Sequence, residues 1–317
     1  MPCVGFNANG LQTAIVSTAS VAVPMAISSA LSAAISGANS PGVTRFSLDG
    51  SKKQTGAAAA PGGRGWNAWF SLAENRVGYS YQPLQSSGKV DLVLAGLDYT
   101  FANNVIAGVA ASWDRTRVGT SFNGGNLSGN GYMVAPYVAM ALTRSWLLDA
   151  SIGFGRASLD QTDNSVVGGI TGSTKDRRTF GALSLSYNYV SGNLMLTGKG
   201  SYLYAEDRLD AFTLSNNTFI AGNTGRLGQV RIGGQAAYNA GSVQPYFGLY
   251  YFRDTQRADQ AALGGTSAAN DKDGVTVQAG LNFYSRGPVY GGIMVSSDQG
   301  RSQVKNDQFM ANIGIRF

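Results

Sequence analysis

The residue types that most enzymes use for acid–base and metal chemistry are scarce in this sequence. It contains no histidine and a single cysteine, Cys3. A Ser-His-Asp triad and histidine-based metal sites are therefore impossible, and a thiol enzyme is not expected. The glycine-rich stretches 62–65 (GGRG) and 124–131 (GGNLSGNG) lack the lysine and the strand–helix context of a phosphate-binding loop. We predict no catalytic residue, no metal site, no cofactor and no enzymatic activity.

Acidic residues occur in two close pairs that could in principle hold a cation. Glu206 with Asp207, and Asp271 with Asp273, fall in stretches that we expect to be outer loops. Solvation accounts for carboxylates in such loops, and a calcium site is the less favoured alternative.

The composition is that of a transmembrane β-barrel. Charged residues make up only 13% of the chain, which also holds 43 glycines, 15 tyrosines and 14 phenylalanines. No stretch of about 20 strongly apolar residues marks a membrane-spanning helix. Few charges, many aromatic residues and moderate hydropathy are typical of strands that alternate between lipid and a polar interior. The net charge of +6 is spread along the chain without a basic cluster, so we expect no nucleic-acid binding.

From Trp66 onward the sequence divides into alternating segments long enough to cross a bilayer as tilted strands. Along 105–115, for example, Val105, Ala107, Val109, Ala111 and Trp113 face one way, and the residues between them, which include Ser112 and Asp114, face the other. This pattern predicts an all-β fold of twelve strands, near 66–73, 90–101, 105–115, 131–142, 146–157, 177–190, 194–205, 227–238, 243–253, 274–284, 288–297 and 306–317.

The connections between these segments alternate between short and long. Short turns of Asn, Gly and Ser type are expected at 102–104, 143–145, 191–193, 239–242 and 285–287. Longer polar loops are expected at 74–89, 116–130, 158–176, 206–226, 254–273 and 298–305. Outer-membrane barrels place short turns in the periplasm and long loops outside the cell. With an even number of strands, the C-terminus is then also periplasmic.

Several charged residues occupy the strand positions that face away from the apolar side. Charges on the lipid face cost several kcal/mol, so this set is expected to line the barrel lumen. The set consists of Asp98, Asp114, Asp149, Arg178, Lys199, Arg231 and Arg316. These residues keep the interior polar, and they could also bind a helix placed inside the barrel. Pro136 lies in the middle of a predicted strand, where a β-bulge would accommodate its missing N–H group.

Taken in order, these segments resemble the translocator β-domain of autotransporters, the type V secretion family of Gram-negative bacteria. The resemblance covers about 66–317. It rests on the opening WNAWFSLAENRVGYSY, the hairpin VLAGLDYTFANNVIAGVAASWDRTRV, the strand cores APYVAMAL and QPYFGLYYF, and the closing FMANIGIRF.

The resemblance implies a 12-stranded antiparallel barrel in the outer membrane with an α-helix threaded through its lumen. The closing strand then resembles the sorting signal read by the barrel-assembly machinery, with a lipid-facing set of Phe309, Ile313, Ile315 and Phe317. The other implied partners are outer-membrane lipid, the chain's own helix and an upstream passenger, and we expect a monomer.

Residues 11–36 are the candidate for the lumen helix, because about 26 residues span about 39 Å and are rich in alanine and serine. Ala26 and Ala30 would allow a close approach to the wall, and Pro24 is expected to kink or break the helix. A signal peptide and a disordered linker are the alternatives. The chain then divides into a helix and flexible connector, 1–65, and the barrel, 66–317.

The family pattern is not complete in this chain. No passenger domain is evident, so we expect either an excised translocator or a very short relative. The Asn-Asn pair that some members use for self-cleavage is absent from 11–36. The expected function is to anchor a passenger and assist its export to the cell surface. The alternatives are a pore for small solutes and an adhesin that binds through its loops.

Overall fold

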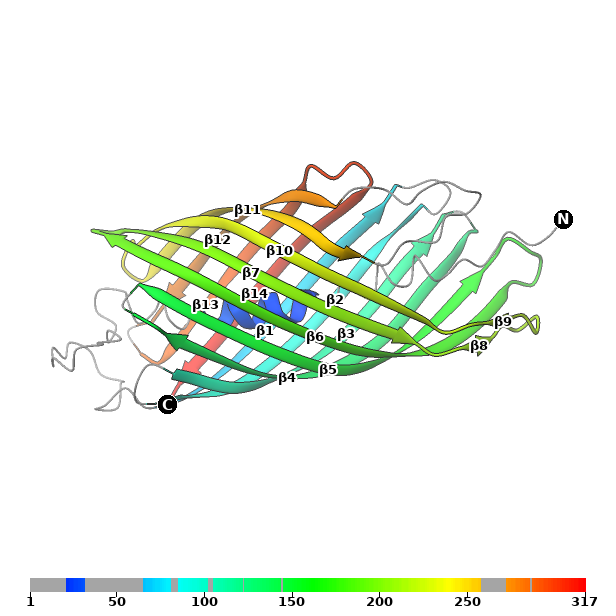
Figure 1. Ribbon diagram of the computed structural model, residues 1–317, viewed down its shortest axis with the longest axis horizontal. Helices are drawn as coiled ribbons and strands as arrows, with labels where there is room; N and C mark the ends of the chain where they lie inside the picture. Colours follow the sequence, from blue (N-terminus) through cyan, green and yellow to red (C-terminus); the bar gives the residue numbers. More distant parts are fainter. Residues whose placement is uncertain are drawn as a thin grey trace.

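The computed structural model describes residues 21–31, 65–80, 85–101, 105–121, 123–143, 145–257, 272–285 and 287–317. Twelve antiparallel strands close into one barrel, with a helix at 21–31 between its walls (Figure 1). The barrel strands are β1 (Gly65–Tyr79), β2 (Ser86–Phe101), β3 (Val105–Thr120), β4 (Gly125–Ala141), β5 (Trp146–Asp163), β6 (Ile170–Ser191), β7 (Leu194–Leu209), β10 (Asn223–Tyr238), β11 (Val243–Arg257), β12 (Asp273–Tyr284), β13 (Val289–Gln299) and β14 (Val304–Arg316). In this part of the chain, no helix has the length and hydropathy needed to cross a membrane.

The strands alternate between a buried inner face and an exposed apolar outer face. In β4, Met133 and Ala135 are buried, whereas Tyr132 and Val134 are 57% and 47% exposed. The outward apolar positions continue to Leu142, about 33 Å along the strand. A strand tilt of about 40° reduces this length to a band about 25 Å tall, which matches the hydrocarbon band of outer-membrane barrels.

Aromatic rings lie over glycines of neighbouring strands inside the barrel. A Cβ atom on Gly96 would lie 2.2 Å from the Trp69 ring, and one on Gly314 would lie 2.3 Å from the Tyr290 ring. Glycine therefore makes room for a large ring where the backbone must be approached closely. This packing accounts for part of the high glycine content.

The first and last strands close the barrel. β1 pairs with β14 from Asn67–Arg316 to Tyr79–Val304. Beyond that ladder, the backbone N–H groups of Trp66 and Phe317 each donate to the other residue's carbonyl oxygen at 2.9 Å. The last residue of the chain is therefore held by hydrogen bonds rather than left free.

The two rims of the barrel differ in how well their strand boundaries were predicted. The turn rim is the end at which β1 begins and β14 ends, and the loop rim is the opposite end. At the turn rim the predicted first residues of β3, β5, β7 and β11 are correct. At the loop rim the strands are longer than predicted: β5, for example, ends at Asp163 rather than at 157.

The loops at the loop rim are correspondingly shorter than predicted. The connection between β3 and β4 is reduced from 116–130 to 121–124. The predicted loop 206–226 contains the end of β7, the start of β10 and a small hairpin of β8 (Phe212–Thr213) and β9 (Phe219–Ile220). Most of the predicted loop at 254–273 lies outside the described residues.

The β-bulge expected at Pro136 is absent. Pro136 pairs with Val109 of β3 in an unbroken ladder. On the β5 side the pairs Val134–Phe154 and Tyr137–Ser151 keep one register, and only the positions between them are unpaired. Proline has no N–H to donate, so the sheet omits a local pairing there without inserting a residue. The register shift that occurs between β10 and β11 lies at Gly228 and Gln229.

Candidate functional site

The barrel interior holds the helix formed by residues 21–31, here called the lumen helix. Its buried side chains recur with helical spacing and contact the inner face of the wall in one apolar cluster. The helical members of that cluster are Ala22, Val23, Ala26, Ile27, Ala30 and Leu31, all at most 4% exposed. The buried wall members come from β1 to β4, β6, β7, β13 and β14, and partly buried Leu147 of β5 and Tyr246 of β11 pack against them. The helix is therefore enclosed rather than attached to one side.

The chain is helical on both sides of Pro24, so this proline does not break the helix. The rest of the predicted segment 11–36 lies outside the described residues. Ala26 and Ala30 are 1% and 2% exposed. Both residues belong to the apolar cluster that the lumen helix shares with the wall.

Two of the predicted lumen cations contact the lumen helix directly. Lys199 of β7 donates a hydrogen bond from Nζ to Ser28 Oγ. Nη1 of Arg231, on β10, lies 3.6 Å from the Met25 sulfur, to which it donates a hydrogen bond. These contacts add polar attachment points to an otherwise apolar packing surface. Asp149 lies close enough to Lys199 for their charges to interact, which partly balances the buried ammonium group.

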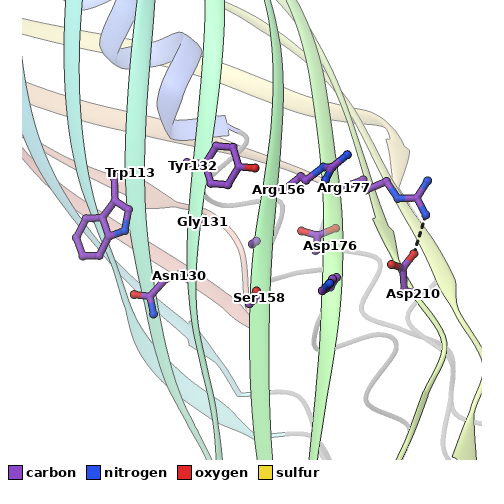
Figure 2. A pocket seen from close by; sticks show the side chains of 11 residues that line it. Trp113, Asn130, Gly131, Tyr132, Arg156, Ser158, Asp176, Arg177 and Asp210 are labelled. Carbon is purple, nitrogen blue, oxygen red and sulfur yellow. Dashed lines mark hydrogen bonds and ion pairs between the residues drawn. The ribbon is translucent and has the colours of Figure 1, made fainter.

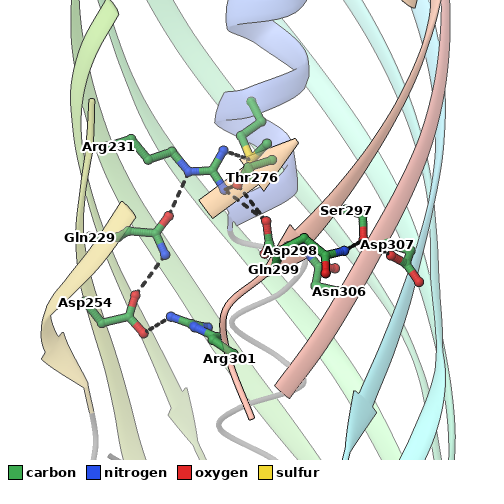
Figure 3. A network of polar contacts seen from close by, with 11 residues as sticks. Gln229, Arg231, Asp254, Thr276, Ser297, Asp298, Gln299, Arg301, Asn306 and Asp307 are labelled. Carbon is green, nitrogen blue, oxygen red and sulfur yellow. Dashed lines mark hydrogen bonds and ion pairs between the residues drawn. The ribbon is translucent and has the colours of Figure 1, made fainter. Parts of the chain in front are cut away.

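Arg231 also belongs to a polar network at one end of the lumen helix (Figure 3). Its Nε donates to Gln229 at 3.1 Å, and Gln229 Nε2 donates to Asp254 at 2.8 Å. Arg301 completes this branch with a 2.5 Å ion pair to Asp254. A second branch runs from Arg231 to Thr276 at 3.2 Å. The network joins the helix-contacting arginine to β11, β12 and the β13–β14 connection.

A third predicted cation, Arg178, forms the most buried ionic contact among the described residues. Its Nη1 lies 2.8 and 2.9 Å from the two carboxylate oxygens of Asp114, and its Nε lies 2.8 Å from Asp176. All three side chains are at most 1% exposed. Gly131 lies beneath this pair, because a Cβ there would be 2.6 Å from Asp114 and 2.7 Å from Arg178. The pair therefore links β3 and β6 across the intervening strands.

The last two predicted lumen charges lie near the closing strands. Asp98 accepts hydrogen bonds from Asn67 Nδ2 at 3.0 Å and from the Tyr137 hydroxyl at 2.7 Å. The Tyr290 hydroxyl donates to Asn67 Oδ1 at 2.8 Å, and Arg316 lies over the Tyr290 ring. This cluster connects β1, β2, β4, β13 and β14, and so reinforces the closure of the barrel.

The structure thus places all seven predicted charges on the inner face, in three separate groups rather than one site. It also adds inner-face residues that were not predicted. Asp207 was assigned to a loop together with Glu206, which is wrong: both belong to β7. Because alternate residues of a strand face opposite sides, Asp207 lies inward at 2% exposed while Glu206 forms outer-face ion pairs with Arg208 and Arg226. Asp207 would have been assigned to the inner face if the alternation of β7 had been continued past the apolar band.

The four residues of the predicted sorting signal lie on the outer face of the last strand and the chain end. Phe309 and Ile313 are each 49% exposed, Ile315 is 44% exposed and Phe317 is 69% exposed. Asn312 of the same strand faces inward. The outer set is therefore available to a hydrophobic environment.

Comparisons with known proteins agree with this architecture. The family model for the autotransporter beta-domain matches residues 45–293. The translocator domain of the autotransporter NalP from Neisseria meningitidis superposes with a TM-score of 0.70 at 13% identity, covering 82% of this chain and 90% of that one. The beta domain of the Bordetella autotransporter BrkA superposes with a TM-score of 0.67 at 15% identity, covering 80% and 100%.

The transport unit of AIDA-I from Escherichia coli is a third structural match, with a TM-score of 0.57 at 10% identity, covering 86% of this chain and 94% of that one. The sequence matches no curated protein. The structural matches share the fold, and the family model covers more than half of the chain. This chain therefore belongs to the autotransporter β-domain family, whose members are transport barrels of the outer membrane rather than a family of enzymes.

Proposed function

We propose that this chain anchors an N-terminal passenger in the outer membrane and assists its export to the cell surface, without enzymatic activity. The observation that carries the proposal is the lumen helix, which is surrounded by wall side chains and tied to Lys199 and Arg231. A helix threaded through a barrel connects the two sides of a membrane by one continuous chain. In this arrangement the loop rim faces the outside of the cell, and the turn rim and Phe317 face the periplasm.

The filled lumen favours a translocator over a pore for small solutes. A conducting pore needs a continuous wet path, whereas the helix and wall form an apolar cluster across the interior. An adhesin that binds through long loops is also less favoured, because four of the six connections at the loop rim span only 80–85, 121–124, 164–169 and 300–303. The β7–β10 and β11–β12 connections are the two longer ones.

The remaining assignments complete this proposal. Residues 1–65 supply the lumen helix and the connector, and 66–317 form the barrel. The barrel works as a monomer, since its ladder is closed and leaves no strand edge for a second copy. Phe309, Ile313, Ile315 and Phe317 form the signal recognised by the barrel-assembly machinery and then contact lipid.

Export is tested by joining an epitope-tagged reporter segment to the N-terminus and expressing the chain in a Gram-negative host. The expected result is reporter that added protease removes from intact cells, while the folded barrel stays in the outer membrane fraction. The matched control carries the same reporter on a variant in which Ala26 and Ala30, both buried in the apolar cluster, are replaced by aspartate. Buried charges should prevent the helix from lying in the lumen. A correctly folded parent barrel whose reporter stays inside the cell would contradict the proposal.

Replacing Phe317 with aspartate is expected to reduce outer-membrane assembly far more than Asn312→Ser. Aspartate places a charged side chain at the outward end of the last strand and removes an exposed aromatic ring. Asn312 faces the interior, where serine is still polar. The measurement is the amount of folded barrel in outer-membrane fractions. Phe317→Ala keeps the backbone bonds to Trp66, so its loss of assembly would isolate the contribution of the ring. Equal assembly of the aspartate and serine variants would contradict the sorting role.

A further inference from the structure

The outer wall near the loop rim carries a row of cations that the translocator function does not use. Five outward residues lie directly opposite one another on five successive strands, β3 to β7: Trp113, Tyr132, Arg156, Arg177 and Arg208. The three arginines are exposed and adjacent. Directly opposite residues have Cβ atoms about 4.5–5.5 Å apart, and like charges at that distance destabilise a sheet. A bound anion would reduce the repulsion between these neighbouring arginines.

The carboxylates beside this row do not balance it. Arg177 pairs with Asp210 at 3.1 Å, and Arg208 pairs with Glu206 at 2.6 Å. Within the described residues, neither Arg156 nor Lys175 has a carboxylate within 4.0 Å. Lys175 lies on the outer face of β6, one outward position closer to the loop rim than Arg177. Two of the four cations are therefore without a partner.

Arg156, Lys175 and Arg177 line a groove of 680 Å³ in the wall, formed chiefly by β4, β5 and β6 (Figure 2). Arg156 and Arg177 lie close together there, with Asp210 bonded to the far side of Arg177. Trp113 and Tyr132 form the aromatic side of the groove. The groove is thus polar and cationic on one side and aromatic on the other.

The groove lies at the edge of the apolar band that is nearer the loop rim. Phe154 lies two residues before Arg156 on the same outer face of β5 and is 54% exposed. Ile152 and Trp146 continue this apolar surface toward the turn rim. A lipid with its acyl chains along this surface would have its headgroup at the level of Arg156, Lys175 and Arg177. Guanidinium groups bind phosphate bidentately, with stronger hydrogen bonds than neutral donors make.

We infer that this groove binds the headgroup of a phosphorylated glucosamine lipid of the outer leaflet. One phosphate lies between Arg156, Lys175 and Arg177, the sugar lies against Trp113 and Tyr132, and the acyl chains lie along Phe154 and the band below. The inference rests on the proposed orientation, in which the loop rim is the outer one. Charge complementarity and the position at the edge of the band favour a lipid over a soluble anion.

The test is native mass spectrometry of the full chain, folded in a neutral detergent and titrated with lipid A or with chemically dephosphorylated lipid A. The variant is Arg156→Gln with Lys175→Gln, which leaves no carboxylate without its partner. The matched control is Arg253→Gln with Lys305→Gln, which removes two exposed outer-wall cations from β11 and β14. All samples must first show the folded band on unboiled electrophoresis, and Arg156→Gln alone replaces the double variant if that variant does not fold.

The expected result is one lipid A retained by the parent and by the control, with affinity roughly tenfold or more weaker in the groove variant. Dephosphorylated lipid should bind weakly to all three, and inorganic phosphate at millimolar concentration should not displace lipid A. Equal binding by the groove variant and the control would overturn the inference, and displacement by inorganic phosphate would replace the lipid with a soluble anion. Because binding is read from the folded barrel alone, a chain that binds lipid A but exports no reporter would overturn only the proposed function.

Discussion

Replacing Ala26 with tryptophan is expected to expel the lumen helix while leaving the barrel closed. Ala26 is 1% exposed and belongs to the same apolar cluster as the surrounding wall. The wall is a continuous ladder of backbone hydrogen bonds and cannot widen locally to admit an indole ring. The helix is held by side-chain contacts alone, so it is the element that moves.

Expulsion can be measured by labelling a cysteine at position 28, in a chain whose Cys3 is replaced by serine. The Ser28→Cys parent should react slowly with a water-soluble maleimide, and addition of Ala26→Trp should make the reaction much faster. Ala111→Trp is the matched control, because it makes the same change on the lipid-facing side of β3. Slow labelling in both tryptophan variants would contradict this expectation, because it would show that the lumen has room for both the helix and an indole ring at position 26.

Replacing Arg178 with leucine is expected to cost about 3–5 kcal/mol of unfolding free energy. Removing one partner of a buried ion pair leaves the other charge uncompensated. Here two carboxylates, those of Asp114 and Asp176, would lose their shared arginine at full burial. The measurement is denaturant-induced unfolding in lipid vesicles, with the outward and exposed Arg115→Leu as the control.

A further variant separates charge from packing. Adding Asp114→Asn and Asp176→Asn to Arg178→Leu removes the uncompensated charges, so part of the lost stability should return. If Arg178→Leu unfolds with the same free energy as the parent, the ion pair does not stabilise the barrel, contrary to the geometry.

The sequence was sufficient to predict the strands in the part of the barrel that lies in lipid. There the outward residues must be apolar, so the alternation along each strand is strong. At the turn rim, short stretches containing Asn or Ser indicate where one strand ends and the next begins. This is why the starts at Val105, Trp146, Leu194 and Val243 were predicted correctly. Toward the loop rim the outward residues become charged, as in Lys175 and Arg177, and the apolar alternation ends before the hydrogen-bonded ladder does.

The interior contacts could be predicted only in part. Alternation along a strand assigns Arg178 and Asp114 to the inner face, but the two residues are 64 positions apart in the chain. Their meeting depends on the stagger of β3 against β6, which is set by strand tilt around the whole barrel. The residues around Arg231 show both cases. Gln229 lies two residues away on the same face of β10, so alternation alone places it beside Arg231. Asp254 and Thr276 join the network only through the registers of β11 and β12.

The central claim is that residues 21–31 occupy the lumen of a barrel that is complete without them. It is tested most directly by the ion conductance of the full chain and of a variant lacking residues 1–60, each inserted into planar bilayers. The shortened chain is expected to fold, with lower thermal stability, and to show large stable openings that the full chain lacks. A folded shortened chain that conducts no better than the full chain would contradict the account, because the helix would then not be what fills the barrel.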